Sequence, residues 1–220
     1  AQAGTAAVFV KRHPIETVGP AGAVVGGAVN VVRAGDVGDD HAALSLVVRH
    51  LVQLGHTRIS HVAGPLDIST GLFRRDGFVR AVTDQGLEAS NCTVYEAGSF
   101  HSEDGHAACA RLLDSGNGYT AIVAANDLLA LGSIDAVRER GLGVPADLSV
   151  TGYDDIALVD RLDPALTTIS LPYEEMGAAA GRLLLDLMAA DDRAIETTAE
   201  PIRLAPTLVV RSSTGPVGSK

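Results

Sequence analysis

Asp154 and Asp155 stand side by side in the segment DLSVTGYDDI (147–156), directly after a run of apolar residues. A carboxylate pair at the end of a buried strand can act as a catalytic or metal-binding acid, as a cap, or as an acceptor for a small ligand. Adjacent side chains of an extended chain diverge, so neighbouring aspartates are poorly placed to share a proton. We therefore expect separate roles, with Asp154 accepting hydrogen bonds from a ligand and Asp155 capping the segment that follows.

Polar and aromatic side chains also follow the three other apolar runs of this region. Arg74 stands at the start of a helical stretch after the first run, and Phe100 follows the second. Asn126 and Asp127 follow the third. An arginine, an amide, a carboxylate and an aromatic ring suit a polyhydroxylated or heterocyclic ligand, because the polar groups pair with hydroxyls while the ring stacks on an apolar face. The predicted ligand-binding residues are Arg74, Phe100, Asn126 and Asp154.

Each of these residues also has an ordinary structural interpretation. Asn126 or Asp127 could cap the apolar helix that follows them. Arg74 could pair on the surface with a nearby acid such as Asp76, and Phe100 could belong to the core. The residue types alone leave these alternatives open.

Motifs for catalysis and metal binding are missing from the sequence. The seven histidines form no H-E-x-x-H pattern, and Cys92 and Cys109 lack metal-type spacing. Neither a G-x-S-x-G elbow nor a phosphate loop G-x-x-x-x-G-K occurs. We therefore predict a binding protein rather than an enzyme, with no catalytic residue, no metal and no cofactor.

The composition is that of a globular protein, and its charge argues against direct binding of nucleic acid by this chain. The 220 residues are 46% hydrophobic and 20% charged, enough to bury one large core or two modest ones. A net charge of −10 disfavours contact with a phosphate backbone. No apolar run reaches 18 residues, so no membrane span is expected. Two cysteines without a disulfide framework favour the cytoplasm.

The elements that must position the polar residues alternate regularly from His56 onward. Short apolar or β-branched runs start 34, 28 and 28 residues apart, and they occupy 58–64, 92–98, 120–126 and 148–154. Apolar residues recur with helical spacing in 39–55, 127–141 and 174–190. This alternation predicts an α/β fold whose parallel sheet is covered on both faces, with ligands beyond the carboxyl ends of its strands.

Several motifs together resemble the effector-binding domain of LacI/GalR transcriptional regulators. Their order and spacing fit that family over about 180 of the 220 residues. They are DDHAALSLVVRHLVQLGHTRISHVAGP (39–65), RRDGF (74–78), AIVAANDLLALGSIDAVRERGLGVPADLSVTGYDDI (121–156), PALTTISLPYEEMGAAAGRLLLDL (164–187) and LVVRSST (208–214). Any one of them would be a weak signal, whereas the combination is specific.

The resemblance implies two doubly wound parallel-sheet lobes of the periplasmic binding protein-like type, with the effector in the cleft between them. The N-terminal lobe would comprise 1–62 with 173–202, and the C-terminal lobe 64–171 with 206–214. Residues 215–220 are expected to form a disordered tail. The resemblance also adds two residues to the predicted site, namely Asp40 on the facing lobe and Tyr173 at a hinge.

The first 35 residues depart from the family pattern. Family members begin with a helix-turn-helix headpiece and two strand–helix units, whereas this stretch resembles only the end of the first lobe, with candidate strands at 6–10 and 23–26. We therefore expect an incomplete N-terminal lobe and no DNA-reading element in this chain.

The resemblance implies the sensing portion of a cytoplasmic, homodimeric regulator. Its effector would be a sugar, a sugar phosphate or a nucleoside, and would bias lobe closure and operator binding through a headpiece absent from this chain. A periplasmic sugar-binding protein that serves a transporter shares the fold and the cleft, and is the alternative. The sequence does not name the effector.

Overall fold

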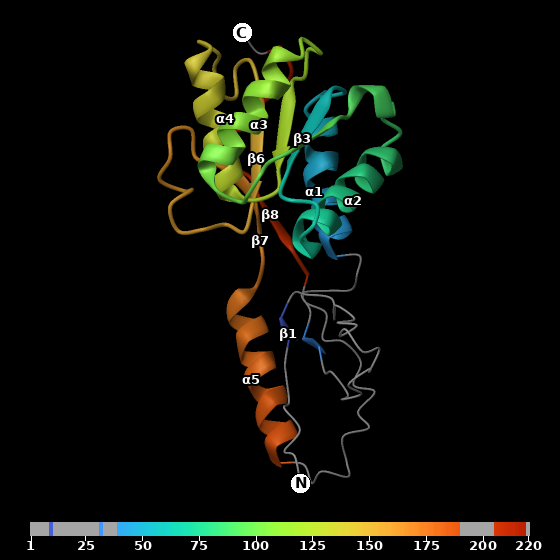
Figure 1. Cartoon of the computed structure of the whole chain (residues 1–220), viewed down its shortest axis with the longest axis vertical. Coiled ribbons are helices and arrows are strands. Elements are labelled where there is room, and N and C mark those ends of the chain that lie inside the picture. The colour runs from blue at the N-terminus through green and yellow to red at the C-terminus, as the bar shows by residue number, and fades with distance from the viewer. Residues whose placement is uncertain (1–8, 11–30, 33–38, 190–204, 219–220) are drawn as a thin grey trace. The chain divides into compact units, whose positions relative to one another are not determined.

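The chain divides into two compact units in the computed structural model (Figure 1). Unit 1 consists of Ala1–Asp39 and Pro172–Ala205, and unit 2 of Asp40–Leu171 and Pro206–Lys220. The structure describes residues 9–10, 31–32, 39–189 and 205–218.

Unit 2 is built on a six-stranded sheet with the strand order β4-β3-β5-β6-β7-β8. The strands are β3 (Ile59–Ala63), β4 (Val94–Glu96), β5 (Ala121–Ala124), β6 (Ser149–Tyr153), β7 (Thr167–Ser170) and β8 (Thr207–Val209). All neighbours run parallel except β8, which is antiparallel to β7. The expected α/β fold with a mostly parallel sheet is confirmed.

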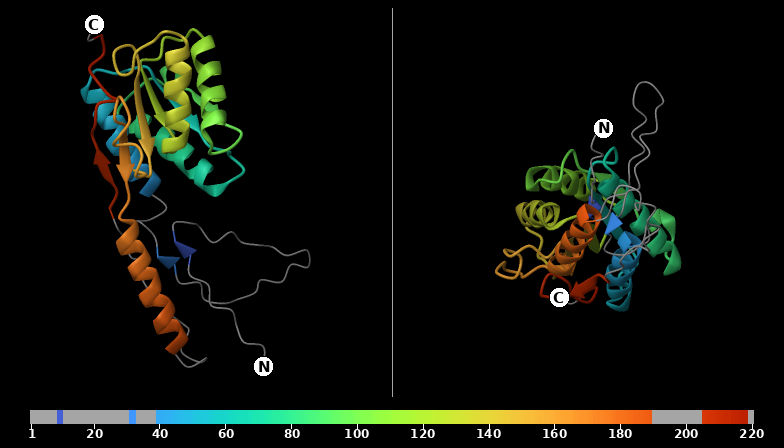
Figure 2. Two further views of the ribbon diagram at one scale, coloured as in Figure 1. Left: turned by 90° about the vertical axis from the view of Figure 1, so that its left-hand side faces the viewer. Right: turned by 90° about the horizontal axis from the view of Figure 1, so that it is seen from below.

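Helices cover both faces of this sheet. They are α1 (Asp39–Gln53), α2 (Ser69–Asp84), α3 (Ser102–Asp114) and α4 (Asp127–Glu139), with a short 3-10 helix at Ala89–Asn91. Figures 1 and 2 show α3 and α4 side by side on one face, with α1 and α2 on the other. Among the described residues, no helix is long and apolar enough to cross a membrane.

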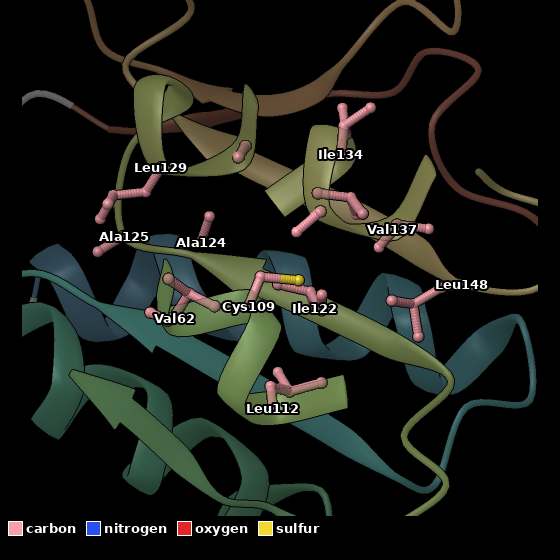
Figure 3. Packing of buried hydrophobic residues seen from close by; sticks show 14 of the residues in the cluster. Val62, Cys109, Leu112, Ile122, Ala124, Ala125, Leu129, Ile134, Val137 and Leu148 are labelled. Carbon is pink, nitrogen blue, oxygen red and sulfur yellow. The ribbon is translucent and has the colours of Figure 1, made fainter. Parts of the chain in front are cut away.

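The main hydrophobic core lies between the sheet and the α3–α4 pair (Figure 3). Leu112 of α3, Leu129 of α4 and Ile122 of β5 are buried members of this cluster. Strands β3, β5 and β6 are buried along their whole length, as expected for inner strands of a parallel sheet that is covered on both faces. Burying one such leucine or isoleucine stabilises the fold by roughly 1.5–3 kcal/mol.

The strand order marks one edge of the sheet as the place for a ligand. The chain passes from β3 through α2 to β4 on one side, and then returns to β5 on the other side of β3. The direction of winding therefore reverses between β3 and β5. In open parallel sheets, ligands bind outside the carboxyl ends of the strands at such a reversal.

Unit 1 contains two short strands and one long helix among its described residues. Strands β1 (Phe9–Val10) and β2 (Val31–Val32) pair in parallel. Helix α5 (Tyr173–Ala189) packs against both strands. The candidate strand at 23–26 lies outside the described residues.

The division into units differs from the expected lobes for residues 40–62. We expected this stretch in the N-terminal lobe, but β3 pairs with β4 on one side and with β5 on the other, which makes it an inner strand of unit 2. Nearly all of α1 also belongs to unit 2. The chain passes from one unit to the other again at Pro172 and at Pro206.

Residues 215–218 belong to the fold, so the expected disordered tail is wrong for this stretch. The backbone N–H of Gly215 donates to Ser149 Oγ at 3.1 Å, and His56 Nε2 hydrogen-bonds to the Gly215 carbonyl at 3.0 Å. The N–H of Val217 donates to the Leu54 carbonyl at 3.1 Å. These partners are remote in sequence, so composition could not reveal them. Residues 219–220 lie outside the described residues.

Gly152 in β6 leaves room for a neighbouring carboxylate. A Cβ at this position would lie 2.2 Å from Asp127 Oδ1 and 2.8 Å from Leu166 Cδ2. Asp127 cannot move aside freely, because its oxygens accept hydrogen bonds from Thr168 and from the N–H of Ile156. The glycine in the GYDD motif is therefore a packing requirement.

We predict that Gly152→Ala lowers the free energy of unfolding by about 1–3 kcal/mol, because the added methyl overpacks this contact. Denaturant titration of the purified protein measures the loss. The control is Gly177→Ala in α5, where nothing lies within 4 Å of the added methyl, and where alanine favours the helix by about 0.5–1 kcal/mol. An equal loss in both variants would contradict the prediction.

Candidate functional site

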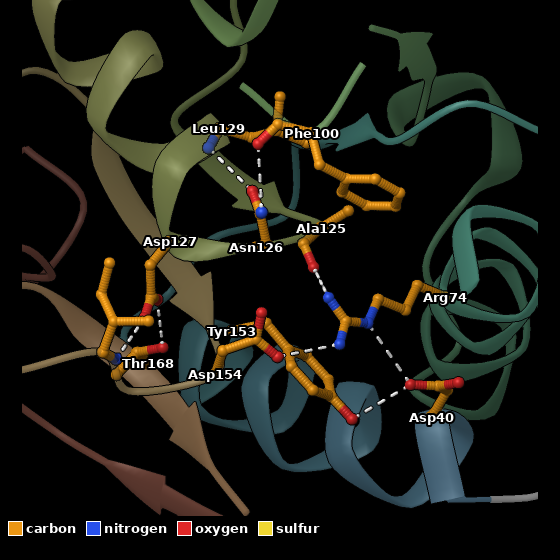
Figure 4. A network of polar contacts seen from close by, with 11 residues as sticks. Asp40, Arg74, Phe100, Ala125, Asn126, Asp127, Leu129, Tyr153, Asp154 and Thr168 are labelled. Carbon is orange, nitrogen blue, oxygen red and sulfur yellow. Dashed lines mark hydrogen bonds and ion pairs between the residues drawn. The ribbon is translucent and has the colours of Figure 1, made fainter. Parts of the chain in front are cut away.

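Arg74 of α2 is the centre of a polar network at the carboxyl edge of the sheet (Figure 4). Its side chain is only 2% exposed. Nη2 donates to Asp154 Oδ1 at 2.9 Å, Nη1 donates to the Ala125 carbonyl, and Nε lies 3.5 Å from Asp40 Oδ1. The guanidinium carbon lies 3.7 Å from the centroid of the Tyr153 ring. These contacts hold the guanidinium in one fixed plane.

The electrostatics of the network keep Arg74 charged and Tyr153 neutral. Burial alone would lower the pKa of Arg74, but Asp154, Tyr153 and Asp40 outweigh burial and raise it above its ordinary value. Burial and the nearby Asp40 carboxylate raise the pKa of Tyr153 well above its ordinary value. The phenol therefore remains a hydrogen-bond donor.

Asp40 reaches the network because α1 and α2 approach closely. The contact occurs at Gly77, where a Cβ would lie 2.9 Å from the backbone carbon and oxygen of Asp40. Gly77 lies three residues, or nearly one helical turn, after Arg74, so the same contact brings Arg74 to Asp40. The Tyr153 hydroxyl donates to Asp40 Oδ1 at 3.0 Å. Asp40 was expected on the facing lobe, but it lies in unit 2 with Arg74.

Asp154 is presented by a strained turn at the end of β6. The backbone φ angle is +110° at Asp154 and +54° at Asp155, values that residues other than glycine rarely adopt. The turn is held by the N–H of Asp154, which donates to the Ile169 carbonyl at 2.8 Å, and by Arg211 Nη2, which donates to Asp155 Oδ1 at 2.7 Å. Strain of this kind persists where the surroundings enforce it, and it is concentrated at functional sites.

The two adjacent aspartates have separate roles, although Asp155 does not cap the following segment as we expected. Asp127 Oδ2 instead accepts from the N–H of Ile156 at 2.9 Å, while its Oδ1 accepts from the Thr168 hydroxyl at 2.6 Å. Asp155 pairs with Arg211. Arg211 lies 56 residues away in sequence, so local pattern could not identify it as a partner.

Asn126, rather than Asp127, is the N-cap of α4. Its Oδ1 accepts from the N–H of Leu129 at 2.8 Å. Its side-chain amide donates to the Phe100 carbonyl at 3.2 Å, and the half-buried Phe100 packs against the core cluster. Asn126 thereby joins the start of α4 to the loop that follows β4. Asp127 is the first residue of the helix rather than its cap.

The structure brings five of the six predicted residues to this edge of unit 2. Arg74, Asp40 and Asp154 are in direct contact, while Asn126 and Phe100 contact each other next to Ala125. The sixth, Tyr173, begins α5 in unit 1 and is 46% exposed.

Tyr153 is the residue that the sequence prediction missed. The available signal was a tyrosine at the end of a buried strand, because a buried phenol needs a hydrogen-bond partner. Its side chain is 1% exposed, and the partner is Asp40, 113 residues away in sequence.

In the described residues, no group of three or more His, Cys, Asp and Glu side chains could hold a metal ion. The network is suited to pairing with hydroxyl groups.

The buried Asp127 predicts a specific pH dependence of stability. Burial raises the pKa of Asp127 from 3.8 to about 6, so the folded chain binds a proton more readily than the unfolded chain between these values. The stability contributed by this carboxyl group is therefore present below pH 4 and lost as pH rises through 6.

We expect the stability of the wild type, relative to Asp127→Asn, to fall by about 2–3 kcal/mol between pH 4 and pH 7. Taking the difference between the two proteins removes the titration of all other groups. Denaturant unfolding at pH 4, 5, 6 and 7 measures it. A difference that stays constant over this range would refute the assignment.

The cap at Asn126 predicts a second stability effect. We expect Asn126→Ala to lower the free energy of unfolding by about 1–2 kcal/mol, because the N–H of Leu129 loses its acceptor. Asn126→Ser, which retains a capping oxygen, should recover a substantial part of the loss. Thermal and denaturant unfolding distinguish the two variants, and equal losses would show that capping is not the cause.

Comparison with known proteins places this fold and site in a family. Residues 48–214 match the periplasmic binding protein-like domain. The HTH-type transcriptional regulator MalR of Streptomyces coelicolor is 45% identical over 184 residues, which are 80% of this chain and 50% of that protein. The chain thus spans about half the length of the curated relatives it matches.

Solved structures give the same result. A LacI transcriptional regulator from a Rhodococcus species is 37% identical with a TM-score of 0.78, over 96% of this chain and 70% of that one. A LacI family regulator from Enterococcus faecium, solved with bound ribose, is 32% identical with a TM-score of 0.75, over 87% and 68%. The Lac repressor dimer bound to operator and an anti-inducer is 28% identical with a TM-score of 0.76, over 96% and 65%. The chain therefore belongs to the periplasmic binding protein-like family, as an effector-binding domain of the LacI/GalR type.

Proposed function

We propose that this chain is the effector-sensing portion of a LacI-type transcriptional regulator, and that it binds its effector at the network centred on Arg74. The observation that supports this most is a guanidinium held in a fixed plane beside the strained Asp154, at the edge where the winding of the sheet reverses. The Enterococcus faecium regulator of the same fold was solved with ribose bound, which supports a small hydroxylated effector.

The proposed contacts divide between polar and apolar groups. Asp154 and Asp40, whose side chains are 25% and 17% exposed, accept hydrogen bonds from ligand hydroxyls. Arg74 holds these carboxylates in place, and the Asn126 amide and the Phe100 ring complete the site on unit 2. Charge-assisted hydrogen bonds contribute roughly 1.5–3 kcal/mol each, so two or three suffice for micromolar binding after binding costs. Tyr173, at the start of α5, is proposed as a hinge contact.

Effector binding is proposed to act by biasing closure of two lobes, unit 1 with α5 and unit 2 with the six-stranded sheet. Moving a two-state equilibrium from 1:99 to 99:1 requires the effector to favour one state by about 5.5 kcal/mol. In the whole regulator, a cytoplasmic homodimer, this bias would alter operator binding through a headpiece. The Lac repressor, of similar fold, is a dimer bound to operator, which supports this arrangement.

Two other functions fit less well. A sugar-binding component of a transporter would share the fold, but the relatives and structural neighbours described above are transcriptional regulators. Catalysis is not proposed, because the same relatives are regulators and the network consists of hydrogen-bonding groups that already hold one another.

The site assignment predicts that Asp154→Asn loses effector-induced thermal stabilisation. A panel of ribose, glucose, galactose, maltose and adenosine is screened by thermal shift, and at least one compound should raise the melting temperature of the wild type by a few degrees. Asp154→Asn should abolish that shift, because the amide removes the charged acceptor, while far-UV circular dichroism remains unchanged.

The matched control is Asp114→Asn, which removes a carboxylate that is 70% exposed and pairs with Arg140. Asp114 ends α3, so it lies at the opposite edge of the sheet. This variant should keep the full ligand shift. A shift preserved in Asp154→Asn would overturn the site assignment.

A further inference from the structure

Residues 212–218, which we call the strap, cross the amino ends of β6 and β7, at the edge of the sheet opposite the proposed ligand site. Ser213 is fully buried there. Its carbonyl accepts from the N–H of Val150 at 2.9 Å, and its hydroxyl donates to the Val150 carbonyl at 2.6 Å. The N–H of Thr167 donates to Ser213 Oγ at 2.8 Å. The strap is therefore joined to the two strands by backbone and side-chain hydrogen bonds.

Two histidines near the end of α1 also hold the strap. His56 Nε2 hydrogen-bonds to the Gly215 carbonyl at 3.0 Å, and His50 Nε2 hydrogen-bonds to Thr214 Oγ1 at 3.0 Å. The strap itself has the sequence SSTGPVG and carries no ionisable side chain. A change of pH in the range of histidine titration therefore reaches the strap through these imidazoles.

The hydrogen bonds of His56 are satisfied by a neutral ring. A carbonyl oxygen can only accept, so the proton of the neutral imidazole lies on Nε2, which faces Gly215. Nδ1 is then an acceptor, and the hydroxyl of Thr120 lies 2.9 Å from it. Protonation makes both nitrogens donors, and the Thr120 hydroxyl must then direct its own proton to the Arg58 carbonyl, 3.4 Å away. This second arrangement is the poorer one.

Burial and mutual repulsion also disfavour the charged rings. Burial lowers the pKa of His50 and of His56, and the charge of His50 lowers the pKa of His56 further, against a smaller opposing effect of the Gly215 carbonyl. The two imidazoles thus oppose each other's protonation.

Other charged groups around the two histidines do not supply a counter-ion. The charged residues on the surrounding elements are Arg49, Arg58, Asp147, Asp163 and Arg211. The first four are exposed, and Arg211 pairs with Asp155. Arg58 Nε donates to the Asn117 carbonyl, and Asp147 accepts from the N–H of Gly143. The effect of charge on the pKa of His56 comes from His50.

We propose that the strap is a pH-sensitive device, which neutral His50 and His56 hold against the sheet and which their protonation in mild acid releases. Because folding lowers the pKa of both groups, their contribution is present above 6.5, the ordinary value, and is lost as the pH falls through the lower folded values. The strap lies outside the main hydrophobic core, so it opens locally while the core stays folded.

Amide hydrogen exchange, followed by NMR on the whole chain at pH 7.5 and pH 5.0, tests the proposal. Each rate is divided by the intrinsic rate of an unstructured peptide at the same pH, which removes the direct effect of pH on exchange. We expect the protection of the Gly215 and Val217 amides to fall on the order of tenfold at pH 5.0, relative to Ile122 of β5. Unchanged relative protection overturns the proposal.

The double variant His50→Gln/His56→Gln identifies the groups responsible. Glutamine does not titrate, and its amide can still donate to the Gly215 carbonyl. We expect this variant to show the same protection of the strap at both pH values. The control is His106→Gln, which removes a histidine that pairs with Glu139 between α3 and α4, and which should keep the fall seen in the wild type. A fall that persists in the double variant overturns the role of the two histidines.

Titration of the ring protons in the wild type gives a second readout, which decides the case in which the double variant loses the strap at both pH values. The NMR signals of His50 and His56 report the protonation of each ring between pH 7.5 and pH 4.5. The loss of protection at Gly215 and Val217 should follow these two titrations. A loss centred at a different pH would show that other groups release the strap.

Discussion

A buried guanidinium must be paired, and the pairing of Arg74 organises this edge of the molecule. Taking an unpaired ion out of water costs several kcal/mol, so its partners have to come from whatever elements meet there. Those partners are Asp40 of α1, the Ala125 carbonyl after β5, and Asp154 after β6, with the ring of Tyr153 against its face. One cation thus ties together four elements that are remote in sequence, and it aligns the acceptors proposed to bind a ligand.

The turn that presents Asp154 depends on a second set of contacts. Left-handed backbone at two consecutive aspartates is unfavourable by itself, and it is held by Arg211 on Asp155 and by Asp127 on the N–H of Ile156. Asp127 in turn occupies space that only a glycine at 152 leaves open. The GYDD motif is therefore a set of mutually dependent positions, in which space, backbone conformation and charge are satisfied together.

Much of the fold could be predicted because it depends on local pattern. Apolar runs and helical spacing were enough for the parallel sheet and for the approximate positions of β3 to β6, α1, α4 and α5. The rule that ligands meet the carboxyl ends of parallel strands then selected Arg74 and Asp154, which are in contact in the structure. The tail at 215–218 was mispredicted, because its order comes from His56 and Ser149 rather than from its own composition.

By itself, the sequence determined the fold class, the family and the edge of the sheet where the polar residues gather, because these follow from periodicity and strand direction. Only the tertiary structure decided which groups pair. Asp155, Asp127 and Tyr153 each have a partner between 29 and 113 residues away, and such choices depend on how helices and strands pack in space. It also decided that Asp40 lies beside Arg74, because the close approach of two helices at one glycine has no signature in local pattern.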